Sequence, residues 1–409
     1  MKRKILYGFI TLVFAALAIF LGVPQNHYIV KALRYQKPKI YHCDIFHNRT
    51  VEKGEAEPWL MAESYNTYNL KDEQLVNLTK TRTVAFLVAV DSAIIYESYW
   101  ENHEKDTYSN SFSMAKSIVS LLVGCAIDDG FIESIDQPVS AFIPEFSEGE
   151  KSRITIRHLL TMSSGLSWDE AYSSLFSTTT QAYYGKFLRE LVLDQTVINE
   201  PGKQFNYLSG DTQILALILT EATGKTVSEY MSEKIWSKIG AEHDAFWSLD
   251  REDGIEKAYC CFNSNARDFA RIGRLILNRG QWNGVQVVSD EYLDITLKPT
   301  QYLSDKELNG VPTERYGHKW WFTSHRGHNV IYARGIMGQY IFIAPELNMV
   351  AVRLGHIRSN ERVNGTPVDV FDYLDIAMDI VAKPHYSSML LRMNVNAGYP
   401  DLVEPNFGQ

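Results

Sequence analysis

The stretch Phe112-Ser113-Met114-Ala115-Lys116-Ser117-Ile118-Val119 carries a serine and a lysine three residues apart at the start of an apolar segment. Apolar residues recur at helical spacing to Ile127, and Gly130 follows, so the pattern predicts a helix over 112–127. The Ser113 hydroxyl and the Lys116 amine then lie on one face and can meet. A desolvated lysine can accept a serine proton, and free N–H groups at a helix start can stabilise an oxyanion. The stretch therefore indicates Ser113 as a nucleophile and Lys116 as its base.

Strand patterns lie at both ends of the chain, around a mostly helical middle. Residues 84–90 and 93–100, joined by the turn Asp91-Ser92, predict a hairpin directly before the Ser113 helix. Further strands are predicted late in the chain, at 319–322, 339–343 and 349–354, before a closing helix at 369–382. The economical packing joins the N- and C-terminal strands in one antiparallel sheet flanked by helices, with a helical lobe beside it. We therefore expect an α/β (α+β) fold.

The first residues differ from the rest of the chain. Lys2, Arg3 and Lys4 precede an uncharged apolar run over 5–23, which is long enough to cross a bilayer as a helix. We expect residues 1–24 to be an N-terminal transmembrane helix and membrane anchor, with a cleaved signal segment as the alternative. In both cases the basic residues face the cytoplasm, and the catalytic domain lies on the periplasmic or extracytoplasmic side, secreted if the segment is cleaved.

The remaining chain divides by composition. Residues 25–80 are polar, aromatic and irregular, which is typical of a linker that leads into a domain over 81–390, with 391–409 as a C-terminal tail. The net charge of −9, without a Lys/Arg cluster that has interleaved aromatic residues, argues against nucleic acid as a partner.

The four cysteines are Cys43, Cys125, Cys260 and Cys261, and their spacing matches no zinc or redox motif. We expect neither a metal nor an organic cofactor. An exported chain could join Cys43 to Cys260 or Cys261, whereas adjacent cysteines rarely bond each other.

Two further motifs could complete a site around Ser113. Tyr207-Leu208-Ser209 precedes an apolar helix, and a tyrosine beside a Ser–Lys pair can relay protons, although a tyrosine more often packs in a core. Ala333-Arg334-Gly335-Ile336-Met337-Gly338-Gln339 has two glycines three apart at a strand, where backbone can approach a ligand closely, or where the chain simply turns. The N–H after Gly335 could be a second oxyanion donor.

In this order, the pieces resemble the β-lactamase-related serine hydrolases over about residues 80–385. The resemblance is carried by the hairpin and by residues 113–117, 154–166, 201–211, 265–273, Gly335 and Gly338-Gln339. The family includes class C β-lactamases, D-alanyl-D-alanine carboxypeptidases, some carboxylesterases and 6-aminohexanoate-dimer hydrolases. It implies a β-lactamase/transpeptidase-like fold.

The resemblance also implies roles for individual residues. Ser113 is expected to be acylated, with Lys116 as base and Tyr207 sharing the proton transfer. The backbone N–H groups of Ser113 and Ile336 are expected to form the oxyanion hole. Candidate substrate contacts are Ser209, Arg334 and Gly335. Apart from the resemblance, Trp168 and Trp321 could line the pocket, with packing or a surface role as the default interpretation.

Two motifs depart from the class C β-lactamase pattern. That pattern has Tyr-x-Asn and Lys-Thr-Gly, where this chain has Tyr207-Leu208-Ser209 and Ala333-Arg334-Gly335. The lost lysine normally helps to hold a β-lactam carboxylate, so the chain looks closer to the carboxylesterase and 6-aminohexanoate-dimer hydrolase branch.

We expect hydrolysis of a small-molecule ester, amide or peptide through an acyl-enzyme. The alternatives are a cell-wall D-alanyl-D-alanine carboxypeptidase or β-lactamase-like enzyme, and a non-catalytic, membrane-tethered sensor that resembles a penicillin-binding protein.

Overall fold

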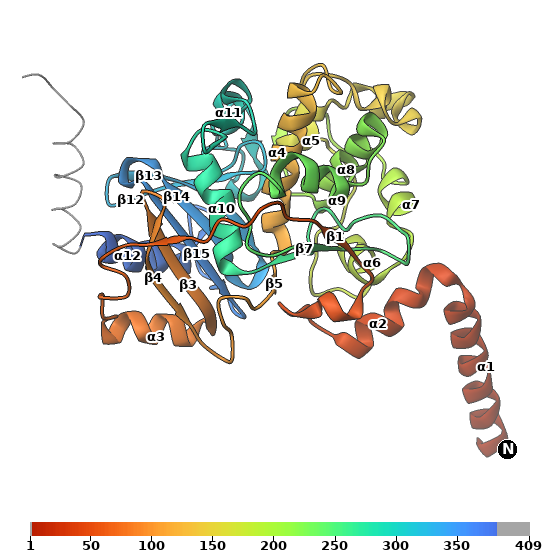
Figure 1. Cartoon of the computed structure of the whole chain (residues 1–409). Helices are drawn as coiled ribbons and strands as arrows, with labels where there is room; N and C mark the ends of the chain where they lie inside the picture. The colour runs from red at the N-terminus through yellow and green to blue at the C-terminus, as the bar shows by residue number, and fades with distance from the viewer. Residues whose placement is uncertain (1, 383–409) are drawn as a thin grey trace, which may run out of the picture.

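Strands from both ends of the chain pair in one seven-stranded sheet, as the sequence predicts (Figure 1). In the computed structural model, which describes residues 2–382, the strand order is β12-β13-β14-β15-β3-β4-β2. Neighbouring strands are antiparallel except for β2 and β4, which are parallel. The strands are β12 (Trp321–His325), β13 (His328–Gly335), β14 (Gln339–Ala344), β15 (Met349–Gly355), β3 (Thr83–Val90), β4 (Ala93–Tyr99) and β2 (Leu60–Met61).

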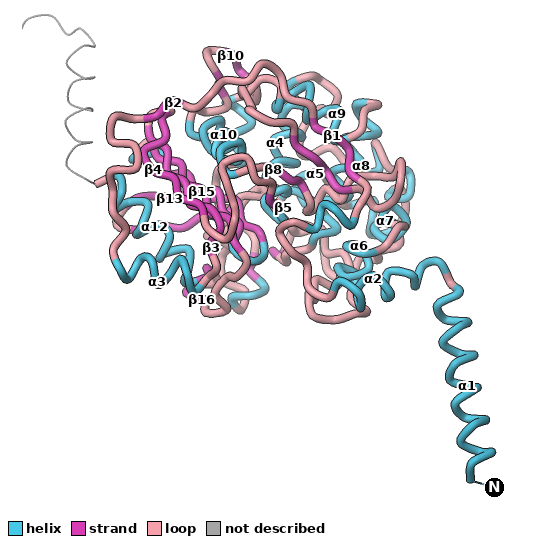
Figure 2. Tube along the Cα trace, turned by 60° about the horizontal axis from the view of Figure 1, so that its bottom comes forward, coloured by secondary structure: helices cyan, strands magenta, loops and turns pink. Residues whose placement is uncertain are grey.

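Helices cover both faces of this sheet. Every residue of β3 is buried, and alternate side chains enter two separate apolar clusters. Leu87 lies in the cluster that includes α10 (Ala266–Leu277), whereas Phe86 lies in the cluster that includes α12 (Val368–Val381). Helix α3 (Asp72–Lys80) packs against α12 (Figure 2). Because strand residues alternate between faces, a sheet buried on both sides needs the continuous apolar run seen here.

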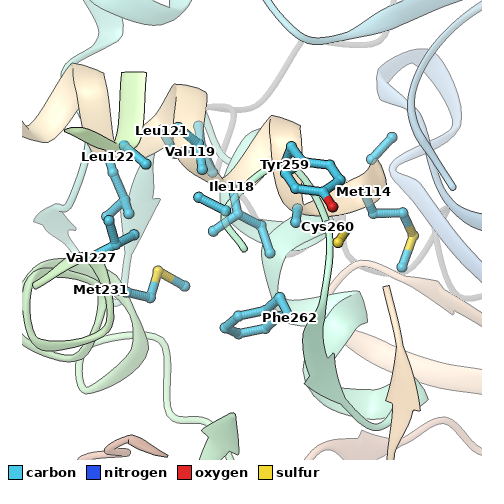
Figure 3. Packing of buried hydrophobic residues seen from close by; sticks show 14 of the residues in the cluster. Met114, Ile118, Val119, Leu121, Leu122, Val227, Met231, Tyr259, Cys260 and Phe262 are labelled. Atoms are coloured by element: carbon cyan, nitrogen blue, oxygen red, sulfur yellow. The ribbon is translucent and has the colours of Figure 1, made fainter. Parts of the chain in front are cut away.

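The helical lobe is built around α4 (Ala115–Asp128), in which every residue from Ala115 to Ala126 is buried. Helix α8 (Ser209–Thr223) packs against α4. Figure 3 shows the α4 side chains among apolar partners from other segments, including Val227, Met231 and Phe262. The remaining helices are α5 (Ile156–Leu160), α6 (Thr178–Tyr184), α7 (Leu188–Leu193), α9 (Val227–Met231) and α11 (Asp290–Thr296).

A four-stranded sheet connects the lobe to the early part of the chain. Its order is β1 (Asn48–Val51), β7 (Ala245–Ser248), β8 (Phe262–Ser264) and β5 (Ser109–Asn110). Three short pairs complete the strands: β6 (Gln204–Phe205) with β11 (Ser304–Asp305), β9 (Gln281–Trp282) with β10 (Val285–Gln286), and β16 (Arg362–Val363) with β17 (Thr366–Pro367).

Residues 25–80 are part of the folded body and not only the linker that their composition predicts. Helix α2 (His27–Tyr35) buries Tyr28, Ile29 and Ala32 in the core, and packs against α6. Strand β1 pairs with β7, almost two hundred residues away along the chain. A short strand whose partner is so distant gives no local signal in the sequence.

The N-terminal segment forms α1 (Lys2–Gly22), which projects from the folded body in Figure 1. Over the residues that the structure describes, no helix is both long and apolar enough to span a bilayer, so the membrane span expected over 5–23 is not supported. The tail expected over 391–409 lies outside the described residues, as does the end of the expected domain from 383 to 390.

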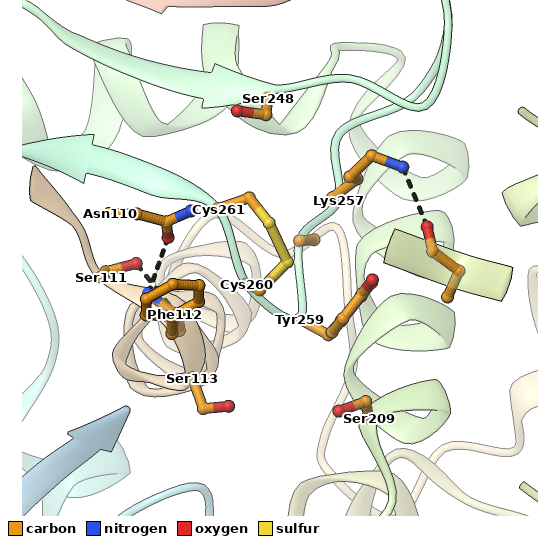
Figure 4. The surroundings of a disulfide bond; sticks show 12 residues. Asn110, Ser111, Phe112, Ser113, Ser209, Ser248, Lys257, Tyr259, Cys260 and Cys261 are labelled. Carbon is orange, nitrogen blue, oxygen red and sulfur yellow. Dashed lines mark hydrogen bonds between the residues drawn. A yellow bond between two sulfur atoms is a disulfide. The ribbon is translucent and has the colours of Figure 1, made fainter. Parts of the chain in front are cut away.

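The expected pairing of Cys43 with Cys260 or Cys261 is wrong, because Cys260 and Cys261 bond each other (Figure 4). Cys43 and Cys125 are free thiols. Cys261 adopts a φ of 69°, in the left-handed region, and the backbone turn that this produces accompanies the bond between neighbours.

Candidate active site

Ser113 lies in a single helical turn, Phe112–Met114, directly before α4. The preceding Phe112 has a φ of 44°, and its N–H donates to the Asn110 side chain at 2.8 Å. The N–H of Ser111 donates to the Phe262 carbonyl of β8 at 2.8 Å. Backbone held in such an unfavourable region is typical of functional positions, because the surrounding structure must enforce it. The turn leaves Ser113 partly exposed, although its neighbours are buried.

Lys116 is held against Ser113 inside the protein. Its Nζ donates to Ser113 Oγ at 3.0 Å and to the Tyr259 carbonyl oxygen at 2.8 Å. The side chain is only 1% exposed, and burial lowers the pKa of Lys116 to about 8, although the Glu170 carboxylate acts in the opposite direction. The predicted Ser–Lys pair is therefore present, with an amine that can lose its proton near neutral pH.

Tyr207 completes the predicted group. The Lys116 Nζ lies 5.1 Å from the centroid of the Tyr207 ring. Burial and the Glu170 carboxylate raise the pKa of Tyr207 above its usual value, while a hydrogen bond with Ser113 partly offsets them. Tyr207 thus stays a neutral phenol at the pH where Lys116 begins to lose its proton.

Strand β13 ends at Gly335 against the segment that carries the nucleophile. A Cβ at Gly335 would lie 2.4 Å from the Ser111 carbonyl oxygen and 3.2 Å from Phe112 Cβ, so the approach requires glycine. The next residue, Ile336, begins the turn Ile336–Gly338. This approach brings the Ile336 end of the strand to the Ser113 segment, which is the arrangement that the predicted oxyanion hole requires.

Two buried side chains that sequence reasoning did not identify hold this turn. Gln339 Nε2 donates to the Ile336 carbonyl at 3.1 Å and to the last carbonyl of β15 at 2.7 Å. Arg353 Nη1 donates to the carbonyls of Met337 and Gly338 at 2.9 and 2.7 Å. Because each carbonyl belongs to the peptide plane of the next N–H, these bonds fix the peptides that follow Ile336, and so hold the turn in which the Ile336 N–H is the first donor.

Arg334 and Trp321, both predicted substrate contacts, stack beside Tyr207. The Arg334 guanidinium carbon lies 3.3 Å from the Trp321 ring centroid, and the Trp321 and Tyr207 rings lie 5.7 Å apart. Arg334 is 8% exposed, and its Nη1 has no hydrogen-bond partner among the described residues. Burial lowers the pKa of Arg334. A guanidinium with a free N–H can donate to a carboxylate.

Ser209 binds a carboxylate that comes from a separate loop. Its backbone N–H and its Oγ donate to the two oxygens of Glu170 at 2.7 and 2.6 Å, and the Tyr172 hydroxyl also donates to Glu170. Figure 4 shows the Ser209 and Ser113 hydroxyls turned toward each other. Glu170 therefore brings a negative charge to the site, close enough to act on Lys116 and Tyr207.

The family model described as Beta-lactamase matches residues 72–370, which is most of the chain. The chain belongs to the β-lactamase family. Its homologues include hydrolases, and the Ser113–Lys116 pair is consistent with a serine hydrolase of this family. Within the described residues, no group of three histidine, cysteine or acidic side chains could hold a metal ion.

Among curated proteins, the chain is similar to 6-aminohexanoate-dimer hydrolase of Paenarthrobacter ureafaciens. The two are 28% identical over 312 residues, which cover 73% of this chain and 78% of that protein. Among solved structures, it is similar to a Bacillus anthracis protein provisionally named 6-aminohexanoate-dimer hydrolase, with a TM-score of 0.67, 22% identity, and coverage of 87% and 95%. It is also similar to a family VIII carboxylesterase, with a TM-score of 0.62, 16% identity, and coverage of 79% and 99%. At these identities the two structural matches show the β-lactamase fold alone.

Trp168 packs next to the site, in line with the packing role that is the default interpretation for it. It is 5% exposed, its indole N–H donates to Thr179 Oγ1 at 2.9 Å, and its ring packs edge-on to Tyr259. A Cβ at Gly210 would lie 2.6 Å from the Trp168 ring, so the ring also packs on the start of α8. Packing on three sides leaves little of this ring for a substrate.

A second buried lysine, Lys319, was not identified from the sequence. Its Nζ contacts Met162 Sδ at 3.1 Å, and its backbone carbonyl accepts a hydrogen bond from Ser117 at 2.7 Å. Burial lowers the pKa of Lys319 to about 7, although Asp211 opposes the shift. Burial likewise raises the pKa of Asp211 to about 7. A basic residue isolated in the sequence carries no signal for such a position.

Proposed function

We propose that this protein cleaves an ester or amide bond of a small substrate through an acyl-enzyme on Ser113. The observation that carries the proposal is the buried Lys116 amine, 3.0 Å from Ser113 Oγ, with a pKa of about 8. At pH 7 about one lysine in ten is then unprotonated, compared with fewer than about one in a thousand at the usual pKa. Burial thus supplies a base without a histidine.

The reaction has two halves. Ser113 Oγ attacks the substrate carbonyl while its proton passes to Lys116, and the N–H groups of Ser113 and Ile336 stabilise the oxyanion. The intermediate collapses as the Tyr207 phenol donates a proton to the leaving alcohol or amine, and Lys116 returns its proton to Tyr207. Water then attacks the acyl-enzyme with Lys116 again as base, which releases the acid and restores the Ser113 hydroxyl.

The names of the similar proteins support esters and amides as the substrate class. One relative is named for hydrolysis of a 6-aminohexanoate dimer, which is an amide, and a structural neighbour is a carboxylesterase. The absence of a lysine at the position of Ala333 argues against efficient hydrolysis of β-lactams.

A D-alanyl-D-alanine carboxypeptidase is the second candidate, because one observation favours it. The Arg334 guanidinium is buried beside Tyr207, and its Nη1 has no hydrogen-bond partner among residues 2–382, so this N–H suits the free carboxylate of a peptide. Turnover of short-chain p-nitrophenyl esters, the linear 6-aminohexanoate dimer and D-alanyl-D-alanine peptides separates the two candidates. The preferred substrate is the one with the highest kcat/KM.

Intact-mass detection of the acyl adduct tests the mechanism. Wild type incubated with the substrate panel and a fluorescent penicillin should gain one acyl mass, located at Ser113 by peptide mapping. Ser113→Ala is the matched control and should gain none. A folded wild type with neither adduct nor turnover would instead favour a binding protein that keeps the fold as a sensor.

The extracytoplasmic location stays a prediction, which fractionation of cells expressing the full chain checks.

A further inference from the structure

The Cys260–Cys261 disulfide lies next to the group that holds Lys116. The Tyr259 carbonyl, which accepts the 2.8 Å hydrogen bond from Lys116 Nζ, is joined directly to the nitrogen of Cys260. Figure 4 shows the disulfide close to Tyr259 and to the segment that carries Ser113. The Tyr259 ring also faces the same amine, with its centroid 5.4 Å from Lys116 Nζ.

Fixed partners hold the two residues that follow Tyr259. The Cys260 N–H donates to the Lys257 carbonyl at 3.0 Å, and the Cys260 carbonyl accepts from Trp247 Nε1 at 2.9 Å. The Cys261 carbonyl accepts from the Ser248 N–H at 3.0 Å. The Tyr259 carbonyl has no such role in the sheet or turn, and its hydrogen bond is to the Lys116 amine.

The disulfide keeps this turn in a backbone that cysteine would not otherwise favour. Cys261 has a φ of 69°, a region where a residue with a Cβ is disfavoured. The bond closes a ring through the Cys260–Cys261 peptide and so restricts the backbone angles on each side of it. When the bond is cleaved, the Tyr259–Cys260 peptide keeps two hydrogen bonds, from the Cys260 N–H to the Lys257 carbonyl and from Lys116 to the Tyr259 carbonyl, and relaxation of the Cys261 backbone strains both.

We propose that the Cys260–Cys261 disulfide is a positioning element for Lys116, and that its reduction lowers the rate of acylation at Ser113. The inference rests on the proposed hydrolase function. A dithiol supplies two electrons and two protons: the S–S bond breaks, two thiols form, and the reductant becomes a disulfide. The Tyr259 carbonyl then turns away, and Lys116 loses the acceptor that holds its amine toward Ser113.

Both cysteines are buried, at 4% and 0% exposure, so reduction by a dithiol needs local opening and should be slow. The test therefore uses two samples. The first is wild type treated with dithiothreitol until its intact mass rises by two hydrogens, with alkylation of the new thiols as the control for complete reduction. The second is a Cys260→Ser, Cys261→Ser double variant. Cys43→Ser, which retains the disulfide, is the matched control for effects of the partly exposed thiol.

We expect kcat for a p-nitrophenyl ester to fall about ten- to a hundredfold, the effect of one hydrogen bond to a charged group, with KM nearly unchanged. The rise of the rate with pH should move to lower pH, because the Tyr259 carbonyl favours the ammonium form of Lys116 and this contact is lost on reduction. Lys116 is also faced by Tyr207, Tyr259, Glu170 and Lys319, which are unchanged in these samples. Reoxidation of wild type should restore the rate.

Reduced wild type with unchanged kcat and pH profile would overturn the inference. If the double variant fails to fold, the reversible reduction of wild type decides alone. If oxidised wild type shows no adduct on Ser113, it is the hydrolase proposal that fails, so the two failures are distinguishable.

Discussion

Gly335→Ala should inactivate the enzyme without altering any proposed reacting group. The backbone at Gly335 is extended (φ −113°, ψ 159°), so alanine is conformationally acceptable and the effect is one of space. Its Cβ would lie 2.4 Å from the Ser111 carbonyl oxygen, where an ordinary contact needs about 3.4 Å. The end of β13 must then retreat by about 1 Å, and the Ile336 N–H retreats with it. A misplacement of about 1 Å can cost about a hundredfold, as can the loss of an oxyanion donor.

The assay is kcat for a p-nitrophenyl ester, with the melting temperature measured on the same samples. Ala333→Gly, on the same strand, is the control: it destabilises by about 0.5–1 kcal/mol without adding an atom near Ser113. We expect Gly335→Ala to lose about a hundredfold in kcat and Ala333→Gly to lose little. A folded Gly335→Ala variant within about threefold of wild type would refute the assignment of the Ile336 N–H.

Three further predictions follow from the charges and contacts of the site. Wild-type kcat/KM should rise with pH around a midpoint of about 8, because only the neutral Lys116 amine accepts a proton. In Glu170→Gln this rise should move to lower pH, because the Glu170 carboxylate favours the ammonium form of Lys116. An unchanged midpoint in this variant would contradict the role of Glu170. Arg334→Gln should lower kcat/KM for substrates with a free carboxylate at least about tenfold more than for neutral esters, and equal losses would exclude a carboxylate at Arg334. Gln339→Leu should lower kcat about tenfold or more, because the turn that follows the Ile336 N–H loses a hydrogen bond that holds it in place, which a rate like that of wild type would disprove.

Much of the fold could be predicted because its signals are local. The apolar run of β3 and the turn after it identify a buried hairpin from neighbouring residues alone. Strand β13 was not predicted as a strand, because it begins with the polar residues His328 and Asn329 and carries Arg334 near its end, so it has no continuous apolar run. The role of residues 25–80 was also missed, since β1 becomes a strand only through pairing with β7.

In the candidate site, too, the contacts between residues close in sequence could be predicted, and the contacts between distant residues could not. Ser113 and Lys116 could be paired from the sequence because one helical turn joins them. Tyr207 needed the resemblance to a family, since its approach depends on how α8 packs against α4. Glu170 reaches Ser209 across thirty-nine positions, and Arg353 reaches the oxyanion turn from another strand. Such contacts depend on tertiary packing, which has no sequence period.

One physical effect can assign opposite roles to two members of the site. Burial disfavours charge of either sign, so it lowers the pKa of Lys116 to about 8 and raises the pKa of Tyr207. The same desolvation therefore keeps the amine available as a base and the phenol available as an acid. Lys116→Arg should remove the base and so abolish acylation of Ser113, because a guanidinium stays protonated even when buried. A Lys116→Arg variant that still acylated Ser113 at the wild-type rate would show that the proton leaves by another route.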